Sequence, residues 1–102
     1  MSLWKYKYFL DVVELKSFTK AGARNYVTQT AVSQQIASLE KMAGGTLLER
    51  GNGEICLTEL GEIVYAYARE MVQTHEQMLH EIERYKESSV VRIGIDSSIN
   101  KL

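Results

Sequence analysis

The chain has 102 residues, of which 45% are hydrophobic and none is Pro. This length allows one small domain with an extension, and the apolar fraction is sufficient for a packed core. No apolar run approaches the ~20 residues of a membrane span, no signal-peptide pattern opens the chain, and the single Cys56 excludes an internal disulfide, so we expect a protein of the reducing cytoplasm.

The net charge of −1 by itself argues against a nucleic-acid-binding protein, but the charge is unevenly distributed. Residues 1–57 carry seven Lys or Arg against five Asp or Glu, whereas residues 58–89 carry three against seven. A mildly basic N-terminal part can contact phosphates if its cations cluster.

Residues 3–15 form the first predicted helix. Apolar side chains at spacings of one and three share one face of it: Tyr6, Phe9, Leu10 and Val13. A second helix follows, because either Ser17 or Thr19 can accept a backbone N–H as its N-cap. The small residues Ala21-Gly22-Ala23 allow another helix to approach closely, and Asn25 and Tyr26 end this helix.

The third predicted helix, residues 28–43, is capped by Thr28 and stopped by Gly44-Gly45. It has a narrow apolar stripe of Val32, Ile36, Leu39 and Ala43. The opposite face carries short polar side chains in place of the usual Glu and Lys: Thr30, Ser33, Gln34, Ser38 and Lys41. Amides and hydroxyls pair with base edges in the major groove. A plain amphipathic surface helix is the alternative, and this pattern alone does not decide between them.

Two short strand-like runs, residues 47–50 and 54–57, flank the tight-turn sequence Gly51-Asn52-Gly53. They predict a small hairpin, or wing, beside the third helix. Arg50 at its root is either a surface charge or a phosphate contact. Cys56 lies between Ile55 and Leu57, which predicts a packed small hydrophobe.

Thr58 caps a long predicted helix over residues 59–87. Its apolar side chains step mostly by three or four, with Thr74 in the one gap, and form a near-heptad seam: Leu60, Val64, Tyr67, Met71, Met78, Ile82 and Tyr85. The simplest partner for this seam is the same helix of a second copy. After Ser88-Ser89, the run Val90–Ile95 predicts a strand, so residues 88–102 are expected to begin a second domain that the chain does not complete.

The chain resembles the N-terminal part of LysR-type transcriptional regulators over about residues 3–95. Residues at the family's spacing carry this resemblance: Ser17-Phe18-Thr19, Gln29, Ala31-Val32-Ser33, Gln35-Ile36, Leu39-Glu40, Leu47, Arg50 and Leu57-Thr58. The resemblance implies a winged helix-turn-helix, a linker helix that dimerises, and a C-terminal effector domain that binds a small-molecule inducer.

The chain departs from the family pattern at four positions. Thr30 stands where the family usually has Pro, which predicts a less rigid start of the third helix. Lys16 replaces a frequent Gly, so we expect a strained or differently built bend. Asn25 replaces a frequent apolar residue, and Leu48 replaces a frequent Phe.

Two other classes of function were weighed against DNA binding. The string from His75 to His80 resembles a zinc-protease motif with one residue too many, and five residues place the two histidines about 140° apart on a helix. Neither this string nor any nucleophile–base pattern favours an enzyme. A protein–protein dimerisation module without DNA binding accounts for residues 59–87 but not for the Gln/Ser/Thr face or the wing.

The sequence therefore predicts a mainly α protein: a winged helix-turn-helix over residues 1–58, a linker and dimerisation helix over 59–87, and the start of an effector-binding domain over 88–102. We expect a bacterial, cytoplasmic, sequence-specific transcriptional regulator that binds double-stranded DNA as a homodimer, with a tetramer as the alternative for a full-length protein. No catalytic residue, metal site or cofactor is expected in this chain. The residues predicted to contact bases are Gln29, Thr30, Ser33 and Gln34. Those predicted to contact the DNA backbone are Thr19, Lys20, Thr28, Ser38, Lys41 and Arg50.

Overall fold

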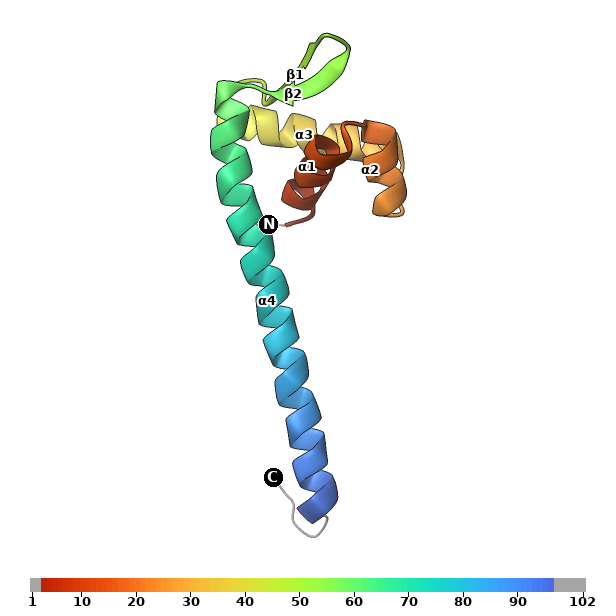
Figure 1. Ribbon diagram of the computed structural model, residues 1–102, viewed down its shortest axis with the longest axis vertical. Coiled ribbons are helices and arrows are strands. Elements are labelled where there is room, and N and C mark those ends of the chain that lie inside the picture. The colour runs from red at the N-terminus through yellow and green to blue at the C-terminus, as the bar shows by residue number, and fades with distance from the viewer. Residues whose placement is uncertain (1–2, 97–102) are drawn as a thin grey trace. The chain divides into compact units, whose positions relative to one another are not determined.

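The computed structural model describes the backbone of residues 3–96 and the side chains of residues 3–88. Within that range lie four helices and one two-stranded antiparallel sheet (Figure 1), in the order α1 (Trp4–Leu15), α2 (Phe18–Arg24), α3 (Gln29–Ala43), β1 (Leu48–Gly51), β2 (Glu54–Leu57) and α4 (Glu59–Asp96). The chain divides after Val72 into two compact units. The predicted winged helix-turn-helix with a long C-terminal helix is confirmed.

The core of the first unit lies where α1, α2 and α3 meet the hairpin and the first turns of α4. The stripe predicted on α3 is buried, with Val32 and Leu39 at 0% exposure. On α1 the fully buried residues are Phe9 and Val12, and Leu47 ahead of β1 is also at 0%. Each such side chain contributes roughly 1.5–3 kcal/mol of burial free energy, so these residues hold the three helices together.

Hydroxyl caps set the helix boundaries. Ser17, not Thr19, caps α2, because its Oγ accepts the backbone N–H of Lys20 at 3.0 Å. Thr28 caps α3 in the same way, accepting from Ala31 at 3.0 Å. Thr58 Oγ1 accepts from Gly61 at 2.9 Å at the start of α4. The helix start predicted at residue 28 is thus maintained without Pro at position 30.

Lys16, at the bend between α1 and α2, adopts the left-handed conformation with φ +54°. This conformation costs a residue with a side chain roughly 1–2 kcal/mol, so the strain expected where the family has Gly is present. The Lys16 ammonium forms an ion pair with Glu54 at 3.2 Å. Both side chains are more than half exposed, so this pair stabilises the fold little.

Gly22 makes the closest packing contact at the helix-turn-helix. A Cβ at this position would lie 2.8 Å from the carbonyl oxygen of Val27 and 3.2 Å from the carbonyl carbon of Thr28. The small residues of α2 therefore accommodate the backbone of the turn and the start of α3, where the sequence predicted the approach of another helix.

We expect Gly22→Ala to destabilise the fold by ~1–3 kcal/mol, because the rigid turn backbone must move and the gain in helix propensity is at most ~1 kcal/mol. Urea denaturation followed by circular dichroism measures the change. Thr19→Ala, which introduces the same residue at an exposed position of α2, is the control and is expected to stay within ~0.5 kcal/mol of the wild type. Equal stabilities of the two variants would contradict the tight approach at Gly22.

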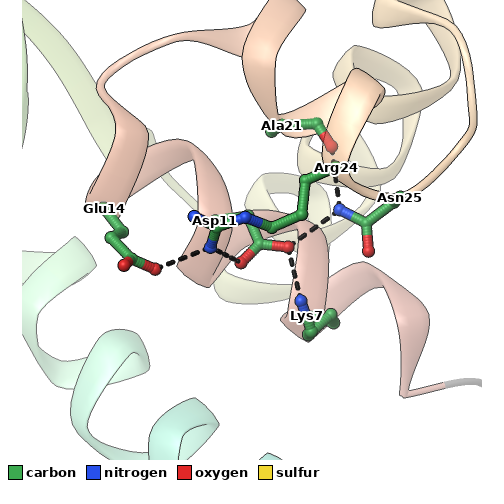
Figure 2. Close-up of polar contacts among 6 residues, drawn as sticks. All are labelled: Lys7, Asp11, Glu14, Ala21, Arg24 and Asn25. Carbon is green, nitrogen blue, oxygen red and sulfur yellow. Dashed lines mark hydrogen bonds and ion pairs between the residues drawn. The ribbon is translucent and has the colours of Figure 1, made fainter.

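A buried carboxylate joins α1 to the end of α2 (Figure 2). Asp11 is 3% exposed and accepts from Lys7 at 2.6 Å, from Arg24 at 3.0 Å and from Asn25 at 2.8 Å. Asn25 also donates to the carbonyl of Ala21 at 2.8 Å. Asn25 therefore supplies a donor to the Asp11 carboxylate that an apolar residue at this position would not supply.

Burial alone would raise the pKa of Asp11, but the hydrogen bonds from Lys7, Asn25 and Arg24 outweigh it, and the pKa falls below its ordinary value. A carboxylate with a depressed folded-state pKa adds stability above its unfolded pKa of about 3.9, and that stability is lost as the pH falls through the folded-state pKa.

We expect Asp11→Asn to cost ~1–3 kcal/mol at pH 7, since three donors lose a charged acceptor. The stability difference from the wild type should shrink as the pH falls below the unfolded-state pKa of about 3.9 and toward the lower pKa of the folded-state carboxylate. Denaturation curves at a series of pH values test both parts. A difference that stayed constant down to pH 2 would show that the charge of Asp11 does not contribute.

The hairpin is tighter than predicted. Gly51 pairs with Glu54 inside the sheet, which leaves a two-residue loop of Asn52 at φ +56° and Gly53 at φ +79°. Positive φ at both loop residues matches the twist of a two-residue hairpin. The prediction that Cys56 is packed is wrong: Ile55 faces the core at 7% exposure, so its neighbour in the strand points outward to solvent.

The prediction of a strand at Val90–Ile95 is also wrong, because α4 continues to Asp96. A strand needs a neighbour to pair its N–H and C=O groups, whereas a helix pairs them within its own segment. The assignment of residues 88–102 to an effector domain stays a prediction, and residues 97–102 lie outside the described residues.

The predicted seam of α4 is divided between two environments. Leu60 and Val64 are half-buried against the core of their own chain, together with the buried Ala68 and Val72, which the seam did not include. Near the start of α4 the exposed apolar side chain is instead Ile63, at 59%. The other predicted seam residues are exposed: Tyr67, Met71, Met78, Ile82 and Tyr85.

Candidate nucleic-acid interface

The face of α3 opposite its buried stripe is open to solvent. Thr30, Gln34 and Lys41 lie within about 40° of one another around the helix and are all exposed. Half-buried Ser33 and exposed Ser38 border them on either side. The only carboxylate of α3, Glu40, accepts the backbone N–H of Leu47 at 2.9 Å. The exposed face is therefore built from hydroxyls, one amide and one cation, with no acidic side chain.

The N-terminus of α3 adds backbone donors to this face. Its first turn has no acidic residue, and Gln29 and Thr30 within it are exposed. The Thr28 oxygen already accepts the cap hydrogen bond, so its hydroxyl proton is the part that remains to be donated. The partial positive charge of this helix end, which no acidic side chain of the first turn offsets, favours an anionic neighbour such as a phosphate.

A surface groove separates α3 from the hairpin. Ser33 and Ala37 of α3, Phe18 of α2, and Glu49 and Arg50 of β1 line it. The structure thus brings the predicted contact Arg50 to the same groove as Ser33, although they are far apart in sequence. It places Thr19 and Lys20 in exposed positions of the first turn of α2, next to Phe18 in sequence.

Sequence reasoning missed one neighbour of this face. Lys5 of α1 donates to the hydroxyl of Ser38 at 3.3 Å. No local pattern could have indicated this contact, because it joins residues 33 positions apart on two different helices.

The family model of the bacterial regulatory helix-turn-helix proteins of the lysR family matches residues 3–62. The chain belongs to this family. It is 36% identical over 100 residues to HTH-type transcriptional regulator BenM of Acinetobacter baylyi, which covers 97% of this chain and 33% of that protein. It is 38% identical over 77 residues to the nitrogen assimilation regulatory protein nac of Klebsiella aerogenes, covering 76% of this chain and 25% of that protein. The chain thus spans about a third or less of the length of these relatives.

Solved structures show the same fold. The crystal structure of a complex between BenM_DBD and catB site 1 DNA aligns with a TM-score of 0.74 and 38% identity, covering 82% of this chain and 93% of that one. Full-length CbnR complexed with its target DNA aligns with a TM-score of 0.70 and 29% identity, covering 81% of this chain and 29% of that one. The match to BenM_DBD over nearly its whole length places the described architecture among DNA-binding domains.

Among residues 3–88, no three His, Cys, Asp or Glu side chains are grouped so that they could hold a metal ion. In the same part of the chain, no helix combines the length and the apolar character that a membrane span needs.

Proposed function

We propose that this chain is the DNA-binding part of a transcriptional regulator and that α3 reads a specific sequence in the major groove of double-stranded DNA. The observation that carries the proposal is the exposed face of α3, which presents amide and hydroxyl groups without a carboxylate. A helix of ~10–12 Å diameter fits the ~12 Å major groove. BenM_DBD and CbnR, whose folds this chain shares, are each in complex with DNA, which supports double-stranded DNA as the ligand.

The residues divide into two roles by their position. Gln29, Thr30, Ser33 and Gln34 lie in the first two turns of α3, the part of a recognition helix that contacts base edges. The remaining residues surround them as backbone contacts, which fix the register on the duplex without reading its sequence: Thr19, Lys20, Thr28, Ser38, Lys41 and Arg50.

We expect Gln34→Ala to relax the preference at one base pair and to cost ~1–3 kcal/mol there, because the side chain lies at the centre of the exposed face and has the amide that pairs with adenine. Selection of duplexes from a random pool by each protein measures the effect. Gln35→Ala is the matched control, since the neighbouring amide is half-buried and turned about 100° from Gln34. A selected sequence identical for wild type and Gln34→Ala would rule out base reading by Gln34.

The second candidate, a dimerisation module that does not bind DNA, is favoured only by the exposed apolar side chains of α4. A salt titration separates the two functions. A DNA-binding protein loses affinity linearly in log salt concentration, whereas a protein-only module shows no duplex binding to titrate.

We also propose that the chain acts as a homodimer through the exposed apolar side chains of α4. Tyr67 is 66% exposed and Tyr85 is 67% exposed, and Ile63, Met71, Met78 and Ile82 recur with them at spacings of three, four and, across Thr74, seven. A second copy would cover these side chains, and it would supply the second recognition helix that half-sites one helical turn apart require. Leu60 and Val64 would contribute only the area that their own core leaves open.

Met71→Glu is expected to weaken the dimer about 10- to 100-fold, the equivalent of losing the ~1.5–3 kcal/mol that burying one such side chain contributes. Analytical ultracentrifugation over a concentration series measures the change. Gln73→Glu introduces the same charge about 160° away around α4 and should leave the dimer intact. A wild-type chain that remained monomeric at high micromolar concentration would refute dimerisation through this helix.

The relatives are about three times as long as this chain. We propose that the full protein continues into an effector domain that binds a small-molecule inducer, and that it works in the cytoplasm, with a tetramer as the higher assembly. Their names support a regulatory role: BenM and nac are regulators of transcription and of nitrogen assimilation, respectively.

A further inference from the structure

Lys5 of α1 lies beside the exposed face of α3, and its ammonium donates to the hydroxyl of Ser38 at 3.3 Å. Lys5 and Lys7 both occupy the first turn of α1, which has no acidic residue. Lys7 is neutralised by Asp11 at 2.6 Å. The Lys5 ammonium instead donates to the neutral hydroxyl of Ser38. Among the residues that the structure describes, no carboxylate lies within ion-pair distance of this ammonium.

This arrangement is electrostatically unfavourable in the protein alone. The N-terminus of a helix carries a partial positive charge, which favours anions and opposes cations. The charge of Lys7 is offset by the buried carboxylate of Asp11. The charge of Lys5 has no such offset and adds to the positive charge of the helix end. A positive potential without an internal counter-charge favours the approach of an external anion.

The position of Ser38 shows where that anion would lie. The residues of α3 that face the hairpin groove include Ser33, Ile36, Ala37 and Glu40. Ser38 lies about 150° around the helix from the middle of that set, on the other border of the exposed face. Lys41, one turn further along α3, is exposed beside it.

A helix in the major groove has a sugar-phosphate strand along each of its two sides. Arg50 of the hairpin lines the groove on the side of α3 where Ser33 lies, and is the proposed phosphate contact on that side. The opposite side, that of Ser38, has no cation from the hairpin, and α1 supplies Lys5 there.

We propose that Lys5 and Ser38 together form a phosphate-binding site for the DNA strand on the side of α3 opposite the hairpin. The Lys5 ammonium would donate to a phosphodiester oxygen, and the Ser38 hydroxyl, which now accepts from Lys5, would donate its proton to the same phosphate. The site rests on the proposed function, because the ligand is the backbone of the duplex that α3 reads. It contributes affinity and orientation without sequence information.

The test compares salt dependence of binding by Lys5→Gln and Lys7→Gln, which change the net charge equally and lie in the same helical turn. The probe is a duplex selected from a random pool by the wild-type chain, with fluorescence anisotropy measured from ~50 to ~200 mM salt. Loss of one phosphate contact per bound copy should reduce the slope of log affinity against log salt by ~0.9 for each copy on the duplex, and should weaken binding about five- to tenfold per copy at ~0.1 M salt. Lys7→Gln should keep the wild-type slope, and Lys5→Arg should restore it. Circular dichroism confirms that each variant is folded.

Ser38→Ala distinguishes a phosphate contact from a purely structural role. If Lys5 only holds the hydroxyl of Ser38 in place, Lys5→Gln will not change the slope of log affinity against log salt when Ser38→Ala is already present. In that case the proposal fails. A further reduction in that background supports a direct contact.

The remaining outcomes separate the two proposals. Equal slopes for wild type and Lys5→Gln, or equal reductions for Lys5→Gln and Lys7→Gln, overturn the phosphate site while leaving the proposed function intact. A wild-type chain that binds no duplex at ~50 mM salt overturns both. An altered selected sequence in Lys5→Gln overturns the assignment to the backbone, since a phosphate contact carries no base preference.

Discussion

The approach of the turn backbone to Gly22 is the contact on which the geometry of the exposed face depends. With 2.8 Å between a would-be Cβ and the carbonyl oxygen of Val27, only a residue without a side chain lets the chain pass this close to α2. Thr28 then caps α3 immediately after the turn. The orientation of α3 relative to α2 is therefore fixed by the turn at Val27 and Thr28. That orientation determines where the exposed face of α3 points.

The hydrogen bonds of Asp11 hold α1 against the C-terminal end of α2, next to the same turn. The Asp11 carboxylate binds Arg24 and Asn25 at the end of α2, so α1 and the C-terminus of α2 cannot move apart without exposing an unpaired buried charge. Arg24 also binds Glu14 at 2.8 Å. With α2 held to α3 by backbone packing and α1 held to α2 by charge, α1 has a defined place beside α3. The Lys5–Ser38 hydrogen bond follows from that placement, which is why a residue of α1 belongs to the border of a face that α3 otherwise makes alone.

Local features of the fold could be predicted from the sequence because their causes are local. The caps at Ser17 and Thr28, the buried stripe of α3 and the hairpin turn each depend on residues within a few positions of one another. The exposed face of α3 follows from the same periodicity, so its residues could be named in advance. The contacts of Lys5 with Ser38 and of Asp11 with Arg24 and Asn25 could not, because α1 meets α2 and α3 through tertiary packing that no spacing encodes. The strand predicted at Val90–Ile95 failed for a related reason: β-branched residues favour a strand only where another strand is present to pair with it.

The first turns of α4 show how one helix serves two surfaces. Ala68 and Val72 belong to the core, and at Gly61 a Cβ would collide with the carbonyl oxygen of Leu47. Large side chains such as Ile63 and Tyr67 are thereby confined to the outer side, where they are more than half exposed. The seam inferred from sequence mixed the two sets, since Leu60 and Val64 lie at the border between them and share the spacing of both. Close packing of α4 against its own domain thus determines which apolar residues remain exposed, and the surface available to a second copy is set by the core of the first.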